Sequence, residues 1–168
     1  MDTFIEKIVA KKKGVKDHLI TIGVVLAVLI AIPVIFNIPV IGNMGLLVSA
    51  VVIYLAYRII TSRNIEFEYI VTNGDLDIDK IVSQRKRKRI FSASCKDFDI
   101  VARVKSNSFS PRVQSIKNRI EAVSSVDSDN AYFATLNYKG EPTVVFFEPN
   151  EKMLENFRLF IPRKILTK

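Results

Sequence analysis

Two long uncharged stretches dominate the first third of the chain. Residues 19–36 and 44–57 contain no charged side chain. A helix needs about 20 apolar residues to cross the ~30 Å hydrocarbon core of a bilayer. The short segment between the stretches holds two Asn, one Pro and one Gly, a composition typical of a turn. We therefore predict a membrane hairpin with helices over residues 18–37 and 43–61.

Two other interpretations of these stretches fit the pattern less well. A helix that is apolar on every face is usually a membrane span, and the rest of the chain is too short to bury two such helices. A cleaved signal peptide has a shorter apolar segment that ends in a small-residue cleavage site. Here a second apolar stretch follows at once, and no such site ends the first one.

The flanking charges predict how the hairpin is oriented. Basic residues precede the first helix and follow the second, whereas the turn carries no charge: Lys11, Lys12, Lys13, Lys16, Arg58 and Arg63. Because cytoplasmic flanks hold the excess of Lys and Arg, we expect a multi-pass protein of the cell membrane with both termini in the cytoplasm. A reducing cytoplasm also suits a chain with a single cysteine, Cys95.

Residues 1–17 form a basic segment with two open interpretations. Thr3 and Glu6 have the spacing of a capping box, which favours the start of a helix. Such a helix would place four apolar side chains on one face and lie among the lipid headgroups: Phe4, Ile5, Ile8 and Val9. The alternative is a frayed basic tail that only sets the topology.

Residues 63–168 have the pattern of one small domain. Apolar and polar residues alternate over 65–72 and 76–82, which predicts two strands, and Asn73-Gly74 between them favours a type I′ hairpin turn. Alternating or largely apolar segments predict further strands over residues 90–95, 98–104, 132–138 and 143–147.

Two helices are expected in the same domain. Apolar residues at helical spacing predict a short helix over residues 112–123. A C-terminal helix is expected to start at Asn150 and to stop at Pro162. About six antiparallel strands followed by this helix predict an α+β fold, a curled sheet or partial barrel closed by the C-terminal helix.

This arrangement resembles the pleckstrin-homology (PH) architecture, which has seven strands and a C-terminal helix. Three segments are similar to a family of small two-helix membrane proteins from Gram-positive bacteria of the Clostridia type: residues 68–81 (EYIVTNGDLDIDKI), the run from Arg85 to Arg89, and residues 147–154 (FEPNEKML). The resemblance covers most of the chain. It implies two membrane helices and a cytoplasmic PH-like domain, and it implies no activity.

Composition and residue types narrow the function classes. The 168 residues are 49% hydrophobic and carry a net charge of +8, so the chain is not disordered. The single histidine, His18, excludes a multi-His metal site within one chain, and its position at the start of the predicted membrane helix leaves no place for a His-dependent triad. The acidic triplet Asp75, Asp77 and Asp79 lacks the Gly and the distal Glu of a calcium loop, which favours the polar face of a strand. We expect no enzyme activity, no cofactor and no metal, and a core position for Cys95.

The basic run Arg85, Lys86, Arg87, Lys88 and Arg89 is the strongest candidate for a binding site. Successive side chains of a strand point to opposite faces, so neither face of this run belongs to a core, and the run must be a protruding tip or an edge. Continued pairing from the Asn73-Gly74 turn sets it near the exit of the second membrane helix. There, each Lys or Arg gains about 1 kcal/mol from anionic headgroups. Two alternatives stay open, a solvated tip without a ligand and, less expected, a nucleic-acid contact.

Two functions remain open at this point. The first is a non-enzymatic, membrane-anchored binding or scaffolding protein whose PH-like domain docks on anionic lipid headgroups and on a protein partner. The second is an accessory subunit of a larger membrane complex. It would assemble through its transmembrane helices at small residues that permit close packing: Gly23, Gly42, Gly45, Ser49 and Ala50. Nucleic acid is not expected as a partner, and a homo-oligomer is compatible with both functions.

Overall fold

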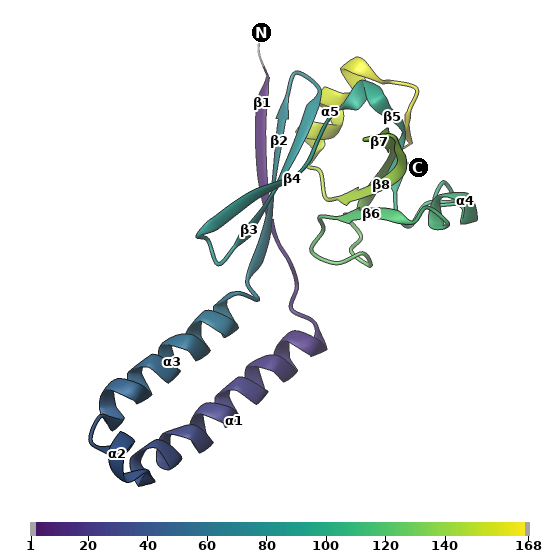
Figure 1. Cartoon of the computed structure of the whole chain (residues 1–168). Helices are drawn as coiled ribbons and strands as arrows, with labels where there is room; N and C mark the ends of the chain where they lie inside the picture. The colour runs from purple at the N-terminus through teal and green to yellow at the C-terminus, as the bar shows by residue number, and fades with distance from the viewer. Residues whose placement is uncertain (1–2, 167–168) are drawn as a thin grey trace. The chain divides into compact units, whose positions relative to one another are not determined.

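The computed structural model describes residues 3–166 and divides into two compact units (Figure 1). A helical unit comprises residues 13–65. The second unit is built from the chain up to Lys12 and again from Glu66 onward. The helical unit is therefore an insertion into the second unit, between two segments that are neighbours in its fold.

The helical unit consists of α1 (Val15–Asn37), the short α2 (Pro39–Gly42) and α3 (Gly45–Thr61). α1 and α3 pack against each other, and their bounds lie close to those predicted. Among the described residues, α1 is the one helix that is long and apolar enough to cross a membrane, and none of its residues is buried. With 17 residues, α3 falls short of the usual length of about 20.

The first sheet of the second unit has the strand order β1-β2-β3-β4. Its strands are β1 (Phe4–Ala10), β2 (Ile65–Thr72), β3 (Asp75–Val82) and β4 (Lys86–Ser94). The expected hairpin turn is present, since Asn73 and Gly74 both have positive φ.

The prediction for the N-terminal segment is wrong, because its described part forms β1 and belongs to the domain. β1 pairs antiparallel with β2, with Lys7 opposite Tyr69 and Val9 opposite Phe67. Val9 is buried, while Glu6 and Ile8 are exposed. The apolar residues of this segment fit the two-residue period of a strand as well as the spacing of a helix. Pairing with β2 selects the strand. The boundary proposed after residue 17 falls inside the helical unit, and the domain proposed over 63–168 lacks its first strand.

The second sheet has the order β6-β8-β7-β5-β9, which brings the described strands to nine instead of about six. Its strands are β5 (Phe98–Arg103), β6 (Asn118–Glu121), β7 (Tyr132–Tyr138), β8 (Glu141–Phe147) and β9 (Ile165–Leu166). The predicted helix over 112–123 is mostly wrong. Only α4 (Pro111–Gln114) is helical, because the following residues pair with β8 as a parallel strand.

Both sheets and the C-terminal helix α5 (Glu151–Phe160) share an aromatic core. The ring of Phe157 on α5 contacts Phe147 of β8 and Phe98 of β5, at centroid distances of 6.4 and 6.1 Å. Phe98 in turn stacks on Phe91 of β4. α5 starts as predicted, where the Asn150 side chain accepts a hydrogen bond from the backbone N of Met153. Cys95, in the 3-10 turn Cys95–Asp97, is a buried core residue, as expected.

A buried hydrogen-bond cluster joins the two sheets where β2 meets the ends of β6 and β8. The Tyr69 hydroxyl donates to the carbonyl of Ala122 and accepts from the backbone N of Glu148 at 3.3 Å. Burial raises the pKa of Tyr69, so the hydroxyl stays protonated and remains a donor. The Glu148 side chain accepts from the backbone N and hydroxyl of Ser124, at 3.0 and 2.6 Å. Lys7 of β1 donates to the Glu148 carbonyl at 2.8 Å and ties the N-terminal strand into this cluster.

The insertion predicts that the second unit folds without the helices when β1 is retained. A joined domain, with Lys12 linked to Glu66 by a short glycine-rich turn, should be soluble and unfold cooperatively in urea, because Ala10 and Glu66 are already paired. A fragment over residues 64–168 should be less stable, since it leaves the β2 edge and the Glu148 carbonyl without their β1 partners. Equal unfolding free energies for the two proteins would contradict the role of β1.

Tyr69→Phe in the joined domain should lower the unfolding free energy by about 1–3 kcal/mol, because the Ala122 carbonyl and the Glu148 N–H lose a buried partner. Urea denaturation measures the loss. Tyr138→Phe is the matched control, since the Tyr138 hydroxyl makes no hydrogen bond to the described residues, and it should change stability little. A similar loss in both variants would argue against the Tyr69 cluster as a specific link.

Candidate functional site

The basic run lies on an exposed edge of the first sheet, as the alternation predicted. Arg85 ends the turn between β3 and β4, and the other four residues begin β4, which is an edge strand. All five residues are exposed. The end of β1, the beginning of β2 and the β3–β4 turn lie at the same end of this sheet, because neighbouring strands run antiparallel. This is the end at which the helical insertion leaves and re-enters the domain.

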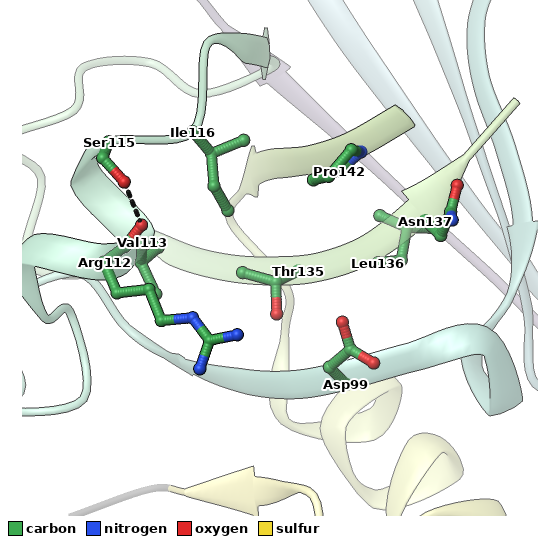
Figure 2. A pocket seen from close by; sticks show the side chains of 9 residues that line it. All are labelled: Asp99, Arg112, Val113, Ser115, Ile116, Thr135, Leu136, Asn137 and Pro142. Carbon is green, nitrogen blue, oxygen red and sulfur yellow. Dashed lines mark hydrogen bonds between the residues drawn. The ribbon is translucent and has the colours of Figure 1, made fainter. Parts of the chain in front are cut away.

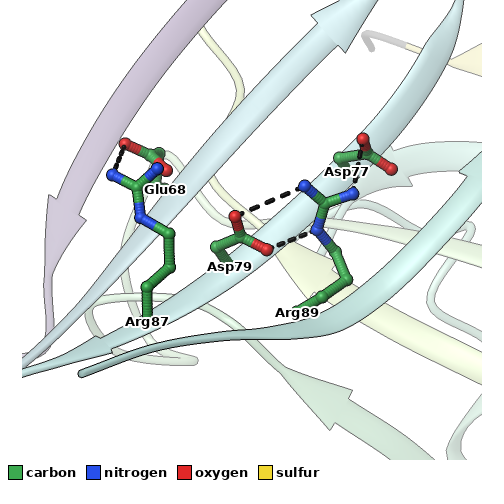
Figure 3. A network of polar contacts seen from close by, with 5 residues as sticks. All are labelled: Glu68, Asp77, Asp79, Arg87 and Arg89. Carbon is green, nitrogen blue, oxygen red and sulfur yellow. Dashed lines mark hydrogen bonds and ion pairs between the residues drawn. The ribbon is translucent and has the colours of Figure 1, made fainter.

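Two of the arginines make ion pairs with acidic residues on one face of the sheet (Figure 3). Arg87 contacts Glu68 of β2 at 2.8 Å. Arg89 contacts Asp77 at 2.6 Å and makes a short contact with Asp79. Asp77 and Asp79 belong to the acidic triplet that the sequence assigned to the polar face of a strand. Asp79, however, is only 5% exposed, and Glu68 only 2%, so these carboxylates are buried beneath the arginines rather than solvated.

The two lysines lie on the opposite face of β4. Lys86 and Lys88 pair in the ladder with Val82 and Lys80, and their side chains form no hydrogen bond or ion pair with any described residue. Their charges are therefore not neutralised within the described structure. The four residues of the run that lie in β4 divide into two sets. Arg87 and Arg89 neutralise buried carboxylates, and the lysines present charge to the surroundings.

The buried Glu68 is a feature that the sequence reasoning missed. Burial raises the pKa of Glu68, the neighbouring Glu6 raises it further, and Arg87 opposes this shift. One of its carboxylate oxygens, Oε2, has no hydrogen-bond partner among the described residues. The alternation over 65–72 placed Glu68 between Phe67 and Tyr69 on the polar face, so its burial left no signal in the sequence.

A cavity of about 370 Å³ opens beside the run on the same sheet face as Arg87. It is lined by Ile8, Glu66, Ile81, Gln84, Arg85 and Arg87. The Gln84 amide reaches the Glu66 carboxylate at 3.5 Å. Because its walls carry both signs of charge, the cavity favours an anion less than the outward lysines do. Within residues 3–166, no group of three side chains is arranged to hold a metal ion.

Gly45 and Ser49, the predicted helix-packing residues, are buried within the helical unit. A Cβ atom at Gly45 would lie 2.6 Å from Cε1 of Phe36 on α1, so glycine permits the close approach of the two helices. Gly23 and Ala50 are exposed. Gly45 and Ser49 are therefore occupied by packing between the helices of this chain.

The two sheets, their aromatic core and the closing C-terminal helix define a domain of the PH-like class. The chain belongs to the family described as Bacterial PH-like domain (DUF6106), whose model matches residues 1–167. The match confirms the bacterial PH-like resemblance, and it carries no statement about membrane topology or a particular bacterial group. No curated protein and no solved structure matches the chain.

Glu68 should make the stability of the domain depend on pH. The folded-state pKa of Glu68 lies above the ordinary value of 4.5. Between these two pKa values, the folded state keeps a proton that the unfolded state has released. The contribution of this group is fully present below the unfolded pKa and is lost as pH rises through the folded pKa. The unfolding free energy of the joined domain, relative to its Glu68→Gln variant, should therefore fall as pH rises above the ordinary Glu pKa of 4.5.

Urea denaturation at several pH values measures this difference. Glu155→Gln, at an exposed position of α5, is the matched control and should show no such trend. A pH-independent difference between wild type and Glu68→Gln would refute the assignment of Glu68 as a proton-binding buried group.

Proposed function

We propose that the chain is a non-enzymatic, membrane-anchored binding or scaffolding protein. The helical unit crosses the cell membrane twice, and both termini lie in the cytoplasm. The PH-like domain docks on anionic headgroups of the inner leaflet through Lys86 and Lys88, with Arg85 beside them, and presents its remaining surface to a protein partner. The observation that carries the proposal is the unneutralised lysine pair at the end of the sheet where the helices are inserted.

The return of the chain supports two crossings rather than one. β1 precedes the helices and β2 follows them, and Ala10 pairs with Glu66 in one sheet. At the ends of the helices, Arg63 binds Asp17, with 2.7 Å between Nε and Oδ1. If α1 crosses a bilayer, α3 has to bring the chain back to the same side for these pairs to form. α3 spans about 26 Å at 1.5 Å per residue, which a modest thinning of the bilayer accommodates.

The short connections support docking close to the membrane. Four residues separate β1 from α1, and three separate α3 from β2. Such segments reach about 10–15 Å when extended. The lysines lie at the tethered end of the sheet, and the attraction of an anionic surface acts within a Debye length of about 8–10 Å.

The alternative function, a subunit that assembles through its transmembrane helices, has less support. Gly45 and Ser49 are already buried between α1 and α3, and among the small residues Gly23 and Ala50 remain exposed. Two exposed small residues on different helices form a weaker packing motif than a continuous stripe.

Docking should be detectable in the full chain reconstituted in nanodiscs. An environment-sensitive dye on Gln84→Cys in the β3–β4 turn should report a less polar surrounding in anionic discs than in zwitterionic discs. The shift should fade at about 0.5 M salt, where the Debye length drops below 5 Å. Lys86→Gln with Lys88→Gln should reduce it, since about 1 kcal/mol is lost per charge.

The matched control is Lys139→Gln with Lys152→Gln, which removes the same charge from the β7–β8 turn and from α5. Chain carrying only the buried Cys95 gives the background labelling. The same dye spectrum in anionic and zwitterionic discs would count against docking, while the membrane anchor would be unaffected by that result.

The two-span topology predicts opposite labelling of two engineered thiols. Asn43→Cys, between α2 and α3, should react with a membrane-impermeant maleimide in intact cells. Lys139→Cys, in the β7–β8 turn, should react only after the membrane is permeabilised. The reverse pattern, or reaction of both thiols in intact cells, would rule out cytoplasmic termini joined to an outer turn.

A further inference from the structure

The outer face of the second sheet carries a second cavity, of about 660 Å³, that shares no residue with the basic run. This volume is within the range of about 300–1,000 Å³ usual for small-molecule sites. The segment between β5 and β7 folds over this face, and its Val113 and Ile116 pack against a cluster around Phe133 and Phe146. Val113 and Ile116 also line the cavity, so the cavity has one apolar wall.

The opposite part of the lining holds polar side chains without partners. Thr135 is only 8% exposed, and its hydroxyl has no hydrogen-bond partner within residues 3–166. Arg112 and Asp99 likewise form no hydrogen bond or ion pair through their side chains to any described residue. In Figure 2, the guanidinium of Arg112 and the carboxylate of Asp99 point into the space on either side of the Thr135 hydroxyl.

A β-bulge places Asp99 at this cavity. Phe98 pairs with Leu136 and Ile100 pairs with Thr135, so Asp99 is the extra residue on β5. A bulge redirects the side chain of its extra residue and is common beside functional sites. The regular pairing of β5 with β7 is thus interrupted at the residue whose carboxylate lines the cavity.

The chemistry of the lining selects for a ligand with two opposite charges. A guanidinium presents a planar pair of donors that matches a carboxylate, and a carboxylate accepts hydrogen bonds from an ammonium group. The Thr135 hydroxyl lines the cavity and has no hydrogen-bond partner within residues 3–166, so it is available to donate to or accept from a ligand atom. The Val113 and Ile116 wall adds a place for an apolar group.

We propose that this cavity binds a small zwitterion with an apolar body, either an apolar α-amino acid or a short peptide. The ligand carboxylate binds Arg112, its ammonium group binds Asp99, and its apolar side chain lies against Val113 and Ile116. The proposal is independent of membrane docking, because it rests on the other sheet of the domain.

Isothermal titration calorimetry on the full chain in nanodiscs tests the proposal, with L-leucine and the dipeptide leucyl-leucine as probes. At least one probe should bind, and the one that binds identifies the source as a free amino acid or a peptide. N-acetylation or C-terminal amidation of that probe should weaken binding at least tenfold. Thr135→Val should weaken it as well.

The charge variants give a matched test of each contact. The Arg112→Gln variant should bind the probe and its amidated form with equally weak affinity, because the partner of the ligand carboxylate is gone. Likewise, the Asp99→Asn variant should bind the probe and its acetylated form with equally weak affinity. Arg158→Gln and Asp127→Asn, at exposed positions away from the cavity, should bind like wild type. The proposal would be overturned if neither probe gave a heat of binding. It would also be overturned if acetylation and amidation both left the affinity of the probe for the wild-type chain unchanged. The blocked probes act on the unmodified chain, so this outcome does not depend on the folding of any variant.

Discussion

The pairing of β1 with β2 is the constraint on which the rest of the structure depends. Seven residues of β1 are held against a strand that begins more than fifty positions later, and everything between them has to leave the domain and come back. The pairing covers the edge of β2, brings Lys7 to Glu148 and fixes the point of insertion of the helical unit. The domain therefore requires the chain to return to the end of β1 after the helices. The lengths of α1 and α3 have to allow this return.

The basic run illustrates how one short motif meets two physical demands. Alternation along β4 sends the arginines to the face with buried carboxylates and the lysines to the other face. Arginine suits the first face because its guanidinium binds two acceptors at once, as Arg89 does with Asp77 and Asp79. On the second face, Lys86 and Lys88 carry flexible point charges that make no ion pair with any described residue. A count of positive charges alone overstates what the run offers to a membrane.

Local patterns in the sequence were enough for the elements whose signals are local. The uncharged stretches predicted α1 and α3, Asn73-Gly74 predicted the hairpin, and Asn150 predicted the start of α5. β1 and β6 were missed because their identity depends on partners far along the chain. Residues 118–121 become a strand only beside β8, and residues 4–10 only beside β2.

The candidate sites, too, were predicted only where their signals are local in the sequence. The position of the basic run at an edge followed from alternation, whereas its ion pairs required the register between β3 and β4 and the proximity of Glu68. The cavity near Thr135 left no sequence signal, because its polar residues come from α4, β5 and β7 and meet only through a bulge.

The insertion also bears on how the protein is made. β1 emerges from the ribosome first, yet β2 is synthesised only after residues 11–64, a delay of about 3–10 s at ordinary translation rates. During this interval β1 has no partner strand. The first sheet can therefore be completed only after both helices of the insertion have been synthesised.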